Sequence, residues 1–147
     1  MRMSLVFPTI LFVFFLVILL LVFRNTINYA GTSMGSSGWS TIRPMTQSVV
    51  YGQEGDFSAS FNSRVEEPIT ITEVNVTDVS GDYSCEVKPD LKGVNVKAFG
   101  SFDLKAVCPY KAEGEVYSIL ITITYMPENG FASDEVTEEG RVLGYSV

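Results

Sequence analysis

The chain has 147 residues, a formal net charge of −7 and no histidine. Its charge is uneven, because the residues up to Pro44 include three basic and no acidic side chains, whereas those from Met45 onward include seven basic and seventeen acidic ones. An acidic surface repels phosphate, so we expect no nucleic-acid partner. The missing histidine removes the commonest general base and most transition-metal sites.

The first element is an uncharged run from Met3 to Phe23 that reads SLVFPTILFVFFLVILLLVF after its first Met. About twenty helical residues at ~1.5 Å each match the ~30 Å hydrocarbon core of a bilayer. Residues 1–24 are therefore predicted to form a hydrophobic transmembrane or filament-core helix. Pro8 predicts that the helix begins near Thr9 or bends early. A secretory signal cleaved near Tyr29–Gly31 is the alternative, although signal peptides usually have an apolar run of only ~7–15 residues.

A Gly/Ser-rich neck is predicted for residues 25–44, because glycines among serines and threonines are typical of a flexible linker. Trp39 is the exception in this segment, since a tryptophan in a free tether would leave a large apolar side chain in water. It is expected to dock on the domain, to lie at a membrane interface or to pack on a neighbouring subunit.

From residue 45 onward, apolar and polar residues alternate with a period of two, which is typical of strands with one buried face. A phase change predicts a bulge near Thr72–Glu73, and the strongest pattern, Val116–Tyr125, predicts a central strand. The fold class predicted for residues 45–147 is an all-β globular domain, an antiparallel Ig-like β-sandwich of seven or eight strands, preceded by one long N-terminal hydrophobic α-helix. The candidate strands are 48–51, 57–61, 69–76, 83–87, 94–98, 102–108, 116–125 and one or two between 136 and 147.

The two cysteines, Cys85 and Cys108, both lie in predicted strands. This arrangement predicts a disulfide formed in an oxidising compartment and places the domain outside the cell. Two buried free thiols are the alternative. Asn75–Thr77 is an N-x-[ST] triplet, so Asn75 is a glycosylation candidate that is expected to point to solvent.

Catalytic chemistry has little support in the sequence. Adjacent residues of a strand point to opposite faces, so the pairs Glu66–Glu67 and Glu138–Glu139 are interpreted as solvated charges and not as an acid/base dyad. Acidic loops could hold Ca²⁺, but no EF-hand spacing is present. We therefore predict no enzyme activity, no cofactor and no metal site. The loop acids that we considered are Glu54, Asp56, Asp78, Asp82, Asp134 and Glu135.

The order of these segments resembles a known family. A hydrophobic N-terminal helix and a polar neck are followed by GQEGDFSASFNSRVEEPITITEVNVTDVSGDYSCEV, by Cys108 ahead of the turn at Gly114, by YSILITITY and by EEGRVLGYSV. This order is similar to that of archaeal type IV pilin-like proteins with a β-sandwich head. The resemblance implies a filament subunit whose N-terminal helices pack into an apolar core.

The function expected from this resemblance is that of a structural subunit of a cell-surface filament that supports adhesion. Its partners would be copies of itself, the membrane before assembly, and a host or neighbouring cell surface or an S-layer. The alternative is a permanently anchored external β-sandwich that binds a partner, as an adhesin or an archaellum stator-like protein does. The residues expected to carry assembly are Leu5, Ile10, Phe14, Val17 and Leu21.

Processing of the N-terminus separates the two expectations. Pilins of this kind carry a short basic leader, and only Arg2–Met3 before Ser4 stands where its cleavage junction would be. Either the chain is close to its mature form, or its anchor is never cleaved.

Overall fold

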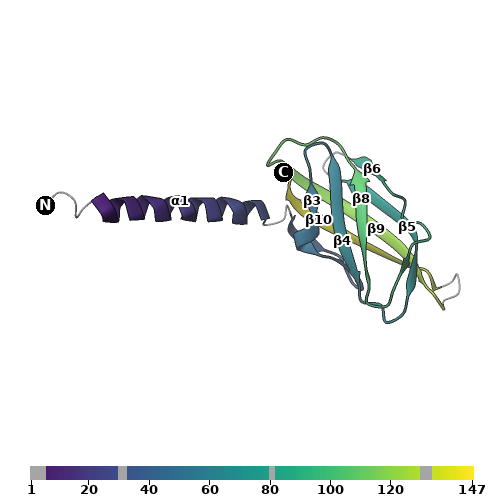
Figure 1. Ribbon diagram of the computed structural model, residues 1–147. Helices are drawn as coiled ribbons and strands as arrows, with labels where there is room; N and C mark the ends of the chain where they lie inside the picture. The colour runs from purple at the N-terminus through teal and green to yellow at the C-terminus, as the bar shows by residue number, and fades with distance from the viewer. Residues whose placement is uncertain (1–5, 30–32, 80–81, 130–133) are drawn as a thin grey trace. The chain divides into compact units, whose positions relative to one another are not determined.

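The computed structural model describes residues 6–29, 33–79, 82–129 and 134–147 (Figure 1). It divides the chain into two compact units, Met1–Ala30 and Gly31–Val147. The first unit contains a single helix, α1 (Val6–Tyr29). The second contains a short 3₁₀ helix, η1 (Thr46–Ser48), and all the described strands.

Helix α1 begins earlier and ends later than the sequence predicted. Its first residue is Val6, so Pro8 lies in the first turn, where backbone N–H groups have no partner within the helix and proline is tolerated. The helix therefore starts before Thr9 without needing a bend. It continues to Tyr29, beyond the predicted end at residue 24.

The side chains of α1 are described over 15 residues, from 8 to 22. Over the described residues, no helix is long and apolar enough to cross a membrane. The predicted membrane span is thus not supported.

The described residues of the second unit form ten strands, and every strand pair is antiparallel. The predicted all-β antiparallel class is therefore confirmed, with more strands than expected. The strands are β1 (Ser33–Ser37), β2 (Ile42–Pro44), β3 (Val50–Tyr51), β4 (Asp56–Ser63), β5 (Ile69–Asp78), β6 (Tyr83–Val87), β7 (Asn95–Val96), β8 (Ser101–Val107), β9 (Val116–Pro127) and β10 (Val136–Tyr145).

The strands lie in two layers that face each other across the core (Figure 1). One layer has the order β1-β10-β9-β5, and the other contains β8, β4 and β2. Strand β6 connects the layers, because it pairs with β5 through Tyr83–Cys85 and with β8 through Glu86–Val87. Beyond β10, Val147 exchanges backbone hydrogen bonds with Tyr51 and Gln53 beside β3. The predicted sandwich is thus nearly closed into a barrel.

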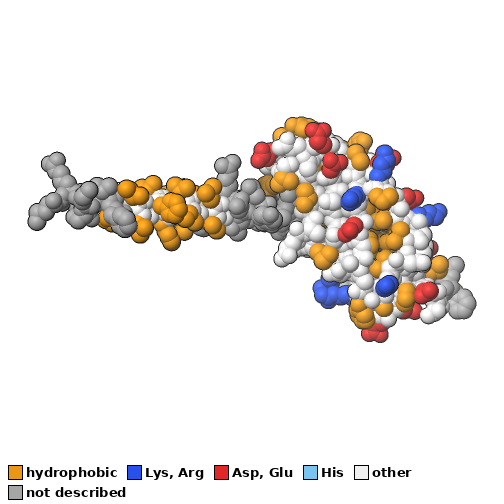
Figure 2. Space-filling view, in the orientation of Figure 1, with side chains coloured by type: hydrophobic (Ala, Val, Ile, Leu, Met, Phe, Trp, Pro, Cys, Tyr) orange, Lys and Arg blue, Asp and Glu red, His pale blue; other side chains and the backbone are white. Residues whose placement is uncertain are grey.

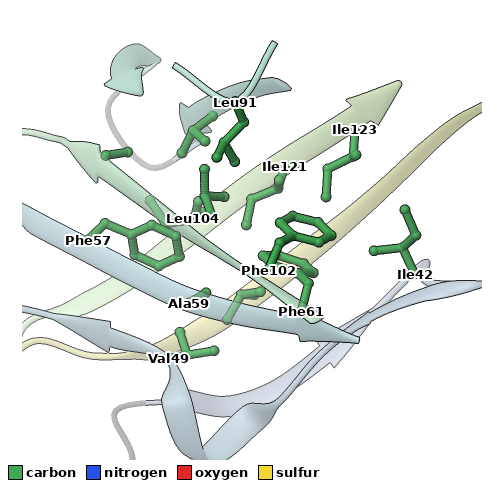
Figure 3. Packing of buried hydrophobic residues seen from close by; sticks show 14 of the residues in the cluster. Ile42, Val49, Phe57, Ala59, Phe61, Leu91, Phe102, Leu104, Ile121 and Ile123 are labelled. Carbon is green, nitrogen blue, oxygen red and sulfur yellow. The ribbon is translucent and has the colours of Figure 1, made fainter. Parts of the chain in front are cut away.

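The core lies between the layers, and most alternating patterns in the sequence point into it (Figure 3). In β9, which lies between β10 and β5, the residues from Tyr117 to Tyr125 are buried at every second position. The predicted central position of this strand is confirmed. Figure 3 labels Ile121 and Ile123 of β9 from one layer. The labelled residues of the other layer include Phe57, Ala59 and Phe61 of β4 with Phe102 and Leu104 of β8.

The predicted bulge is present in β5. The register between β5 and β9 shifts between Ile71 and Glu73. Ile69 and Ile71 are buried before the shift, and Val76 is buried after it. The extra residue lets both halves of a ten-residue strand turn apolar side chains to the same core.

Two predicted segments differ from the structure. Residues 33–37 and 42–44 of the expected neck form β1 and β2 and belong to the β unit, because small polar residues can occupy an edge strand when the partner strand supplies the backbone hydrogen bonds. Of the expected strand 94–98, only Asn95–Val96 forms a strand, β7, which pairs with β5. Phe99 has a positive φ of 55°, which ends an extended segment at this point.

Candidate assembly site

The described surface of α1 is apolar on all sides. Every residue from Ile10 to Val22 is a large hydrophobic residue that is 43–67% exposed within the chain. Figure 2 shows this part of the helix covered by hydrophobic side chains on the face in view. A helix that is apolar all round is normally buried by other protein or by lipid. The surface of α1 is therefore a candidate interaction site.

The predicted assembly residues lie on this surface but do not stand out from it. Ile10, Phe14, Val17 and Leu21 follow a spacing of four, three and four residues, which places them along one side of a helix. Residues on the other sides of α1 are exposed to a similar degree. The predicted residues are therefore one part of a continuous apolar surface. Leu5 lies outside the described residues.

Trp39 lies on the crossover from β1 to β2 and packs on the β unit. Its ring contacts the ring of Phe61 edge to face, with 5.2 Å between centroids. It also covers Gly140 of β10, where an added β-carbon would overlap the indole. Of the three expected positions for Trp39, docking on the domain is the one observed. This contact holds the segment that follows the helix against both layers.

A buried carboxylate fixes the same crossover. Glu138 of β10 accepts hydrogen bonds from the backbone N–H of Thr41 and from that of Ile42, each at 2.8 Å. The Thr41 hydroxyl also donates to Glu138 and lies 2.9 Å from the hydroxyl of Tyr125. Burial and the nearby Glu138 raise the pKa of Tyr125. Glu138 is therefore a structural group, and the prediction that it is a solvated charge was wrong.

A second buried polar group lies at the other side of the core. Asp78, the last residue of β5, forms an ion pair with Lys111 at 3.0 Å, and both side chains are more than 90% buried. The Lys111 ammonium lies 5.7 Å from the centroid of the Tyr51 ring. Burial, and then the charges of Asp78 and Glu115, raise the pKa of Tyr51. Asp78 is thus part of the core. The prediction that it belongs to an acidic surface loop was wrong.

The predicted disulfide is present between Cys85 and Cys108, with an S–S distance of 2.03 Å. Cys85 is the last β6 residue that pairs with β5 before the strand turns to β8, and Cys108 directly follows β8. The bond therefore joins the two layers where β6 changes partners. The alternative of two free thiols does not hold in this structure.

The remaining acidic side chains offer no catalytic arrangement among the described residues. Glu138 and Glu139 point to opposite faces, as predicted, since one is buried and the other exposed. Glu66 and Glu67 lie in a bend and not in a strand. The described residues contain no group of three or more His, Cys, Asp or Glu side chains that could hold a metal ion. Open pockets include one of about 240 Å³ between β1 and β2 and one of about 360 Å³ beside Phe57, Lys105 and Val107.

Asn75 lies in β5 and is exposed, as the sequence predicted. Its side-chain amide donates a hydrogen bond to Glu73 at 2.8 Å. An exposed amide is compatible with glycosylation, which stays a prediction.

Comparison with known proteins adds little to this description. No protein-family model matches the chain, and no curated protein matches it significantly. A chain from the solved structure of the Salmonella enterica SafA pilin in complex with the SafB chaperone is similar, with 12% sequence identity and a TM-score of 0.47. The similarity covers 73% of this chain and 55% of that chain. It identifies neither a family nor an activity.

Proposed function

We propose that this protein is a structural subunit of an archaeal type IV pilus-like filament at the cell surface. The observation that carries the proposal is the uniformly apolar surface of α1, in a chain whose other unit is a compact, disulfide-bonded β unit. Such a helix needs a partner on every side. Other copies of α1 supply that partner, and the resemblance of the whole sequence to archaeal pilin-like proteins supports the same arrangement.

The energy available from helix packing is large enough for assembly. Burying one Leu, Ile, Val or Phe side chain contributes about 1.5–3 kcal/mol. Because the 13 residues from Ile10 to Val22 are 43–67% exposed, about half of this contribution is still available from each, or about 10–20 kcal/mol in all. This matches or exceeds the ~4–15 kcal/mol that association costs in lost freedom of motion. Because α1 is apolar on every side, one copy can contact several other copies through different sides of its helix. Such contacts need not close into a ring and can extend into a filament.

The β unit would form the outer part of the filament. Its acidic side chains keep it soluble and its disulfide suits an external location. Contact with a host cell, a neighbouring cell or an S-layer would involve this unit. We propose no enzymatic activity for it, because the described residues contain no catalytic arrangement of the kinds considered above.

Shearing and N-terminal sequencing test the proposal in cells that produce the protein. We expect the chain in the sheared filament fraction, and Phe14→Lys with Val17→Lys should remove it from that fraction, because buried charge opposes helix packing. The control Val107→Lys changes an exposed residue on the outer face of β8 and should leave filaments intact. Filaments that still form with the helix variants would overturn the proposal. Retention of the chain in membranes with Met1 intact would instead support the anchored adhesin or stator-like alternative.

A further inference from the structure

A second apolar surface lies on the β unit, on the outer face of the layer that contains β9 and β10. Val116 of β9 is opposite Tyr145 of β10, and Leu143 of β10 is opposite Ser118. Val79, which follows β5, donates its backbone N–H to Ser118. The four apolar residues Val79, Val116, Leu143 and Tyr145, here called the corner patch, are 39–51% exposed. They are adjacent, so they form one surface.

The corner patch lies where the polypeptide enters the β unit from α1. Ser33, the first residue of β1, is opposite Gly144, which stands between Leu143 and Tyr145. Only residues 30–32 separate the end of α1 from this point. In a filament built on α1, the corner patch of each copy is therefore close in sequence to the helix contacts.

Charge favours one binding partner for the corner patch over another. A second β unit would bring an acidic surface, because residues from Met45 onward carry seven basic and seventeen acidic side chains, and two such units repel each other. Helix α1 has no charged residue between Met3 and Phe23. An apolar, uncharged helix can cover the patch without burying an unpaired charge.

We propose that the corner patch binds the α1 helix of a second copy of this chain. The inference rests on the proposed filament function and names the partner of the β unit within it. Each copy offers one helix and one patch, so the contact is heterologous and repeats from copy to copy. It would cover the side of α1 that faces outward from the helical core and would set the position of each β unit on the filament.

Photo-crosslinking in assembled filaments tests the partner directly. Tyr145 is replaced by p-benzoylphenylalanine in the full chain, and ¹⁵N-labelled and unlabelled copies are mixed before assembly. We expect crosslinks from position 145 of one isotopic form to residues 8–22 of the other. The same probe at exposed Tyr83 is the control. The inference would be overturned by crosslinks that occur only within one copy or that reach only residues 33–147 of another copy. It would also be overturned if position 145 gave no more crosslinks than position 83.

A substitution test separates this inference from the proposed function. Leu143→Lys and Val116→Lys should each reduce the yield of filaments at least tenfold, with unfolding midpoints in urea close to that of the unmodified chain because both side chains are exposed. Val107→Lys is the matched control and should assemble normally. If the unmodified chain forms filaments and the corner-patch variants form them equally well, only this inference fails. If the unmodified chain forms no filaments, the proposed function fails and this inference falls with it.

Discussion

The carboxylate of Glu138 accepts the backbone N–H of Ile42 at 2.8 Å, across 96 residues of sequence. A strand near the C-terminus thereby holds the first residue of β2 and, through Thr41, the crossover that precedes it. The contact makes the segment after the helix a fixed part of the β unit.

Removing this carboxylate should destabilise the β unit. Glu138→Ala leaves the N–H groups of Thr41 and Ile42 without their buried acceptor, and each hydrogen bond to a charged group contributes about 1.5–3 kcal/mol. We expect the free energy of unfolding in urea to fall by about 3–5 kcal/mol. Glu139→Ala is the control and should change it by less than about 0.5 kcal/mol, since Glu139 is exposed. Equal effects of the two substitutions would contradict the structural role of Glu138.

Gly140→Ala should displace the indole of Trp39, because the added methyl group would overlap it. The cost should be about 1–3 kcal/mol, which is typical of overpacking. Trp39 is the only tryptophan of the chain, so its fluorescence reports the movement directly, and the emission should shift to longer wavelength as the ring becomes exposed. Gly93 and Gly114 are the controls. Both are exposed, have a positive φ and leave open space for an added methyl group, so alanine at either position tests backbone strain alone and should leave the emission of Trp39 unchanged. An unchanged emission spectrum in Gly140→Ala would argue against the observed Trp39 contact.

Lys111→Met should be more damaging than the loss of an exposed lysine. It removes the ammonium group that forms an ion pair with the buried Asp78, and breaking a buried ion pair from one side costs about 3–5 kcal/mol. The double variant Lys111→Met with Asp78→Leu should recover much of this loss, because it removes both charges. Lys88→Met breaks an exposed ion pair with Glu86 and should have almost no effect. Urea unfolding of the four proteins gives the comparison, and a double variant no more stable than Lys111→Met would contradict the coupling.

Stability should fall at high pH partly because of Tyr51. Burial and the charges of Asp78 and Glu115 raise the pKa of Tyr51 above its ordinary value of 10.0. The folded state therefore keeps the phenolic proton to a higher pH than the unfolded state. This contribution is fully present below about pH 10 and is lost as the pH rises above it.

Tyr51→Phe tests this sign. The variant loses the hydrogen bond to the carbonyl of Pro109, so it should be less stable by about 0.5–1.5 kcal/mol at pH 8. Between pH 10 and 12 its stability should decline less steeply than that of the unmodified chain. Tyr110→Phe changes an exposed tyrosine and should keep the original slope. Parallel curves for all three proteins in urea unfolding would show that Tyr51 does not contribute.

Local patterns in the sequence predicted much of the β unit. The alternation from Tyr117 to Tyr125 predicted a buried central strand, and the phase change near Thr72 predicted the bulge in β5. Both succeed because side-chain direction in a strand depends on its immediate neighbours in sequence. The segments 33–37 and 42–44 were missed, because their pairing partners lie far along the chain and their own composition is that of a loop.

The sequence by itself determined the division into a helix with a long uncharged run and an acidic β unit, since composition and period are properties of consecutive residues. It also indicated the disulfide, because both cysteines lie in strand patterns. Only the tertiary structure decided that Glu138 is a buried acceptor, that Asp78 pairs with Lys111, and that four separate apolar residues form the corner patch. The physical reason is that burial and pairing depend on which distant segments of the chain come into contact, and a local sequence pattern does not predict these contacts.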